Sequence, residues 1–126
     1  MMLCLKAGAL VVPLMSPTAT LAWTHSVEKI AWEEAWRATP RGVELVQARV
    51  RGSGAGMDPP PEARLVEGAW TWRPSVPPQG EVILRRSGAT ADWRVCLGGA
   101  CRPIGDYLPE EADPVALTVC EGPARP

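Results

Sequence analysis

The alternation of apolar and polar residues along the chain predicts a series of short β-strands. Residues 32–38 read WEEAWRA, which places Trp32 and Trp36 on one face at a period of two, although a helix is also compatible with this stretch. The residues TPRG at 39–42 are typical of a turn, and residues 43–50 read as a strand. Two such runs joined by a four-residue turn form a hairpin, which favours a strand for residues 32–38.

Further short strands are predicted along the rest of the chain, with Gly- and Pro-containing turn signals between them. We expect them at residues 21–25, 69–73, 81–86, 92–97, 100–104 and 115–119. Short strands with recurring turns predict an all-β fold, a small antiparallel β-sandwich or barrel-like domain.

The segment CLGGAC predicts a tight hairpin clipped by a disulfide. Gly98 and Gly99 supply the positive φ that a two-residue turn requires. Cys96 then faces Cys101 as a non-hydrogen-bonded pair, whose close spacing suits a disulfide. Half of a zinc site and a pair of reduced thiols are the alternatives. Since the chain has one histidine and no second close cysteine pair, we expect no metal and no cofactor.

The first 22 residues have the pattern of a secretory signal peptide. Lys6 precedes an apolar run that extends to Met15, and the small-residue segment TLA at 20–22 resembles a cleavage site. The run is shorter than the ~20 residues needed to cross a bilayer. We therefore expect a leader at residues 1–22, a single β domain at 23–126 without a membrane span, and a location outside the cytoplasm (periplasm or secreted). The alternative is an N-terminal strand of the core.

Cleavage of this leader would remove Cys4 and leave Cys120 without an obvious partner. Cys120 is then buried and inert, or forms an intermolecular bridge, or pairs with Cys96 or Cys101. The sequence leaves these alternatives open.

The charge of the chain argues against nucleic acid as a partner. The formal net charge is −1, and the basic residues are scattered instead of forming a patch that would neutralise phosphates. The six tryptophans, with no phenylalanine, indicate a core built from a few very large side chains.

Two segments are the candidate binding sites. The first segment contains the only histidine of the chain, among other polar residues. No nucleophile-elbow signature accompanies it, so these residues are better suited to binding a loop or a ligand than to catalysis. The second is a glycine-rich loop whose backbone N–H groups could surround an anion, or which is simply a proline-braced bend. The candidate residues are His25, Ser26, Glu28, Gly52, Ser53, Gly54 and Gly56.

Two other features have simpler interpretations. Glu33 and Glu34 are adjacent, so on a strand they face opposite sides and cannot form a carboxylate dyad. Trp70 and Trp72 share a strand face and are expected in the core, unless an exposed pair marks a binding surface. We therefore predict no catalytic residue.

Several stretches resemble a small bacterial family, the domain of unknown function 1850. They are WTHSVEK (23–29), WEE with Trp36 (32–36), GSGAGM with its prolines (52–60), and DWR with the cysteine pair (92–103). Members of this family are typically encoded beside tripartite transporters of the TAXI type, which take up organic solutes with an extracytoplasmic binding protein.

The resemblance implies an exported, non-enzymatic accessory of TAXI-type solute uptake. Its expected partners are the transporter membrane subunit, the solute-binding protein, or a small organic anion. A small hydrolase using His25 and an envelope structural protein are the alternatives.

Overall fold

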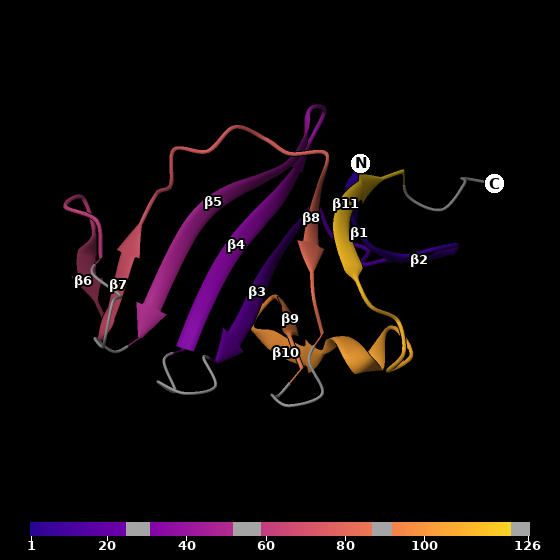
Figure 1. Ribbon diagram of the computed structural model, residues 1–126. Coiled ribbons are helices and arrows are strands. Elements are labelled where there is room, and N and C mark those ends of the chain that lie inside the picture. Colours follow the sequence, from indigo (N-terminus) through magenta and orange to yellow (C-terminus); the bar gives the residue numbers. More distant parts are fainter. Residues whose placement is uncertain (25–30, 52–58, 87–91, 122–126) are drawn as a thin grey trace.

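A computed structural model of the chain describes residues 1–24, 31–51, 59–86 and 92–121. These residues form eleven β-strands and one short 3₁₀ helix (Figure 1). The elements are β1 (Met2–Ala7), β2 (Leu10–Pro13), β3 (Thr18–Thr24), β4 (Ala31–Thr39), β5 (Gly42–Arg51), β6 (Arg64–Val66), β7 (Ala69–Trp72), β8 (Glu81–Leu84), β9 (Arg94–Leu97), β10 (Ala100–Pro103), η1 (Ile104–Asp106) and β11 (Val115–Cys120). The predicted all-β class is confirmed. The described residues contain no helix long and apolar enough to cross a membrane.

The strands form two antiparallel sheets of unequal width. The small sheet has the order β2-β1-β11-β8, and the large sheet has the order β10-β9-β3-β4-β5-β7-β6. The small sheet packs on β3, β4 and β5, while β6 and β7 extend beyond it at the far end of the large sheet (Figure 1). The molecule is therefore a sandwich in which the small sheet covers only part of the core-facing side of the large sheet.

The core follows the period of two along the strands. On the large sheet, Leu21 and Val95 face inward and are fully buried. On the small sheet, Leu5, Leu84 and Leu117 meet them in one apolar cluster. We call the side of the large sheet that faces this cluster the inner face, and the opposite side the outer face.

The predicted hairpin of residues 32–50 is confirmed as β4 and β5. The Thr39 hydroxyl donates to the Gly42 carbonyl at 2.8 Å and closes the turn. One β-bulge interrupts the pairing: Ala35 pairs with Gln47 and Trp36 with Leu45, so Val46 is the extra residue. A bulge re-aims side chains, and here it brings Val46 onto the outer face beside Gln47.

The predicted hairpin disulfide between Cys96 and Cys101 is confirmed. These two residues are direct partners in the β9–β10 pairing. Gly98 and Gly99 take φ values of 58° and 88°, as the tight turn requires.

The second disulfide joins Cys4 to Cys120, which corrects the prediction for Cys120. None of the three alternatives had considered Cys4 as its partner, because Cys4 was assigned to the leader. In the full chain all four cysteines are therefore paired.

The segment predicted as a leader lies within the fold. β1 is an inner strand of the small sheet, paired with β2 and β11, and Leu3, Cys4 and Leu5 are all fully buried. Cleavage after Ala22 would remove β1, β2 and most of β3. In the uncleaved chain β1 is a core strand, and removal of residues 1–22 as a leader stays a prediction.

A buried guanidinium ties the region between β8 and β9 to the chain before β11. Arg86, whose side chain is 8% exposed, donates from Nε and Nη2 to the two carboxylate oxygens of Asp92, at 3.1 and 2.8 Å. Its Nη1 donates to the carbonyls of Pro109 and Ala112. Asp92 also accepts the backbone N–H of Gly105 at 2.9 Å. This carboxylate is thus engaged in a structural clamp.

Candidate functional site

The sequence-predicted site residues fall outside the described part of the chain. They follow β3 or β5, and they are His25, Ser26, Glu28, Gly52, Ser53, Gly54 and Gly56. The structure does place the residues that flank them: Thr24 pairs with Ala31, and Ala31 pairs with Arg51. The two candidate segments therefore leave the large sheet at the same end of three neighbouring strands, which their sequence separation does not reveal (Figure 1).

Three tryptophans pack together at this end of the sheet. The rings of Trp23 and Trp32 stack nearly parallel, with centroids 5.7 Å apart, and Trp93 lies 4.7 Å from Trp23 at an interplanar angle of 47°. The Trp93 indole donates to the Arg85 carbonyl at 2.9 Å. This cluster gives a rigid base to the strand ends from which the candidate segments depart.

The outer face of the large sheet is polar and open within the described residues. Cross-strand partners share a face of a sheet, so the register assigns its members. They are Thr18, Thr20, Ala22, Thr24, Ala31, Glu33, Ala35, Arg37, Glu44, Gln47, Arg49, Arg51, Arg64, Val66, Ala69, Thr71, Arg94, Cys96, Cys101 and Pro103.

A groove of about 610 Å³ lies on this face beside the hairpin disulfide. Its floor includes Thr20 and Ala35, its wall is formed by Cys96 and Cys101, and Val46 closes the side toward β5. A smaller hollow continues it toward Arg49 and shares Thr20, Glu33 and Ala35 with it. We call this region the disulfide groove; it is open because Ala35 is small and because the disulfide stands above the sheet.

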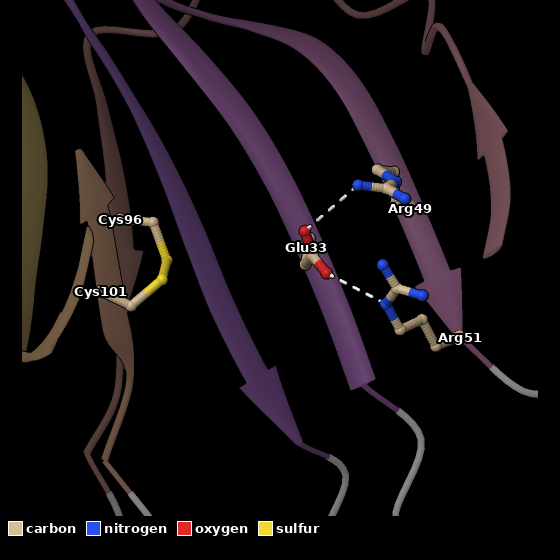
Figure 2. Close-up of a disulfide and its surroundings, with 5 residues drawn as sticks. All are labelled: Glu33, Arg49, Arg51, Cys96 and Cys101. Carbon is tan, nitrogen blue, oxygen red and sulfur yellow. Dashed lines mark ion pairs between the residues drawn. A yellow bond between two sulfur atoms is a disulfide. The ribbon is translucent and has the colours of Figure 1, made fainter. Parts of the chain in front are cut away.

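Glu33 is held between two arginines at the edge of the groove. Its carboxylate lies 3.7 Å from Arg49 and 3.5 Å from Arg51, as Figure 2 shows together with the disulfide across β3. The three side chains are 25–46% exposed, so each pair contributes only up to about 1 kcal/mol to stability. The arrangement thus fixes the positions of charges more than it stabilises the fold.

The outer face carries a positive excess although the whole chain is slightly acidic. It has five arginines and two glutamates among its described members. Such a face attracts anions and acidic surfaces. Recognition of carboxylates or of an acidic partner is the chemistry that it supports best.

Glu33 and Glu34 face opposite sides of the sheet, which confirms the prediction that they form no dyad. Glu34 lies on the inner face, opposite Leu21 and Ala48. Burial raises the pKa of its carboxyl, and the neighbouring indole N–H of Trp36 counters part of this rise. The indole N–H lies close enough to the carboxylate for this effect but does not reach hydrogen-bonding geometry with it or with any other residue in the described ranges.

The outer-face residues were missed as a site by sequence reasoning. Polar residues do alternate along β5, at Glu44, Gln47, Arg49 and Arg51. The bulge at Val46 shifts the period by one residue, so the alternation is not continuous. A polar strand face is also the ordinary appearance of a solvated sheet, and only the register shows that these residues line hollows.

Comparison with known families identifies the chain. A family model described as a domain of unknown function, DUF1850, matches residues 19–104. The chain belongs to this family. The DUF1850 match runs from β3 to the end of β10, so it contains almost all of the large sheet and its outer face, whereas β1, β2 and β11 lie outside it. Comparisons with curated proteins and with solved structures gave no match.

Proposed function

We propose that this DUF1850 protein is a non-enzymatic accessory of solute uptake by a TAXI-type tripartite transporter. It acts outside the cytoplasm, in the periplasm or as a secreted protein. Through its outer face it binds either a transporter component, which is the membrane subunit or the solute-binding protein, or a small organic anion.

The hollowed outer face is the observation that carries this proposal. In a sandwich of two sheets, the outer surface of a sheet is usually a plain solvated face. Here it has a groove of about 610 Å³ and an excess of arginine. A concavity on a charged face is a candidate binding surface.

The two disulfides support a location outside the cytoplasm. Structural disulfides persist in oxidising compartments and are rare in the cytosol. Cys4–Cys120 joins the two ends of the chain and Cys96–Cys101 lines the groove. An oxidising compartment is therefore where both cross-links would persist.

Site-specific photo-crosslinking in cells that contain the transporter tests the proposal. A photoreactive amino acid replaces Thr20 or Gln47 on the outer face, and Ile83, which is 51% exposed on the small sheet, serves as the control. We expect crosslinks to a transporter component from the outer-face positions and not from Ile83. No such crosslink, together with no thermal stabilisation by any solute that the transporter carries, would overturn the proposal.

An activity screen tests the non-enzymatic part separately. The purified protein is assayed with ester, amide and phosphate substrates, and we expect no turnover. Turnover that His25→Ala abolishes in a variant that still folds would establish the hydrolase alternative instead.

A further inference from the structure

A second concavity lies at the other end of the outer face, beside the tip of the β4–β5 hairpin. It has a volume of about 550 Å³ and is enclosed between β5 and the connection that leads from β7 to β8. Three arginines line it, Arg37, Arg41 and Arg73, with Val46 and several prolines. We call it the arginine hollow. Arg37 and Val46 also line the disulfide groove, so the two concavities are continuous.

The connection that walls the hollow is fixed to the hairpin. Val43 and Gln79 exchange two backbone hydrogen bonds, at 2.7 and 2.9 Å. Gly42 has a φ of 122°, and a Cβ there would lie 2.1 Å from the Gln79 carbonyl oxygen, so only glycine permits this approach. Between this anchor and β7, Pro74, Pro77 and Pro78 restrict the backbone further. The hollow is therefore formed before any ligand arrives.

Two of the three guanidinium groups are available for a ligand. Arg37 forms an ion pair with Glu44, which also lines the hollow. Arg41 and Arg73 form no ion pair with any other residue in the part of the chain that the structure describes. A guanidinium binds a planar carboxylate through two parallel hydrogen bonds, which suits these two side chains.

The edge of β5 adds a main-chain donor. β7 pairs only with residues 48–51 of β5, and Val43 pairs with Gln79, so the edge between them is open. Ladder pairs alternate along an antiparallel strand, and since Val43 directs its N–H and carbonyl to Gln79, Leu45 directs its own toward the same side. Leu45 lines the hollow, and its N–H can donate to an anion there.

We propose that the arginine hollow binds a small organic acid. Its carboxylate is held by Arg41 and Arg73, and its apolar part lies against Val46 and the proline-rich connection. This inference names the ligand class for one part of the outer face, and so it rests on the proposed function as a binding accessory.

Calorimetric titration of the full-length, oxidised protein tests the inference. The probes are benzoate, its neutral analogue benzamide, and inorganic phosphate. The test variant is R41Q/R73Q; the matched control is R64Q/R94Q, which loses the same charge from exposed outer-face positions that do not line the hollow. We expect benzoate to bind and benzamide not to bind, with affinity for benzoate at least about tenfold weaker in R41Q/R73Q and within about twofold of wild type in R64Q/R94Q.

Each other result overturns the inference. Equal losses in the two double variants would mean attraction to general positive charge, and unchanged affinity in R41Q/R73Q would place the site elsewhere. Binding of benzamide or of phosphate as tightly as benzoate would exclude an organic carboxylate as the ligand class. Absence of benzoate binding would also reject it, yet crosslinks from Thr20 to a transporter component would then still support the proposed function. Circular dichroism of both variants confirms that they fold.

Discussion

At the scale of single residues, two neighbouring arginines allow a buried ion pair to be compared with an exposed one. Arg86 has an 8% exposed side chain, whereas its neighbour Arg85, paired with Asp113, is 74% exposed. Removing one partner of a buried pair leaves an uncompensated charge. We expect Arg86→Met to lower the free energy of unfolding by about 3 kcal/mol or more, and Arg85→Met by less than about 1 kcal/mol.

Urea unfolding followed by tryptophan fluorescence measures both variants. The neighbouring position is a close control, because both substitutions remove an arginine from the same short segment. Similar effects of the two substitutions would show that the clamp adds nothing specific to stability.

Glu34 predicts a pH dependence of stability. Burial raises the pKa of its carboxyl in the folded state above the ordinary value of 4.5. The folded protein thus holds this proton more tightly than the unfolded chain, so the free energy of unfolding falls as the pH rises from below 4.5 through the raised pKa. Above the raised pKa the cost of the buried charge is fully present, and we expect Glu34→Gln to be more stable than wild type there.

The difference between Glu34→Gln and wild type should nearly vanish near pH 3.5, where the carboxyl is protonated in both states. Urea midpoints at neutral pH and near pH 3.5 give the comparison. Glu33→Gln, on the outer face of the same strand, is the control. A stability gain for Glu34→Gln that does not change with pH would show that titration of this carboxyl is not its cause.

At the scale of elements, local chemistry predicted the hairpins, whereas the N-terminal residues fit two interpretations, a leader and a core strand. Residues 32–50 carry a clear turn, and CLGGAC carries both its turn and its cross-link, so local chemistry determined them. β1 has three successive buried residues, Leu3 to Leu5, and such a strand reads as a continuous apolar run. That run is also typical of a leader, and the pairing of β1 with β11, at the other end of the sequence, is not visible in local sequence.

The N-terminal segment gives a test by truncation. A chain that begins at Trp23 lacks β1 and β2, and it loses Leu3 and Leu5 from the core, each a burial worth about 1.5–3 kcal/mol. It also leaves β11 with a single neighbour. Since domains of this size are stable by only about 5–15 kcal/mol, we expect the truncated chain not to fold cooperatively.

Near-UV circular dichroism and urea unfolding show whether the truncated chain folds. The control is the full chain with C4S/C120S, which loses only the cross-link; we expect it to fold, with a free energy of unfolding lower by about 2–5 kcal/mol. Cooperative unfolding of the truncated chain would instead support removal of residues 1–22 as a leader.

At the scale of the whole molecule, the unequal sheets create the candidate site. The four-stranded sheet covers the inner face of the seven-stranded sheet, and the core lies between them. The outer face of the seven-stranded sheet stays broad and uncovered within the described residues. The DUF1850 match follows the wide sheet and leaves out β1, β2 and β11. The site residues named from sequence lie outside the described ranges, yet their flanking strands end together on this sheet. Sequence spacing could not show that, because β-register determines which distant residues become neighbours.

The groove itself provides the most direct test of how the molecule works. Thr20 lies on its floor, between Cys96 on β9 and Ala35 on β4. An arginine there would fill the groove and add charge, while the open face should keep the cost in stability below about 1 kcal/mol. We expect Thr20→Arg to reduce solute uptake in cells to the level of a strain without the protein, with a thermal midpoint changed by only a few degrees.

Ile83→Arg is the control for this prediction, because it places the same side chain on an exposed position of the small sheet. Uptake should stay normal in that variant. Gln47→Tyr, which narrows the adjoining hollow, gives a second means of blocking the face should Thr20→Arg fold poorly. Full uptake with both blocking substitutions at normal protein levels would mean that the partner or solute does not use the disulfide groove. Equal loss in Ile83→Arg would point instead to a general effect of added charge, because the two sheets face opposite sides of the molecule.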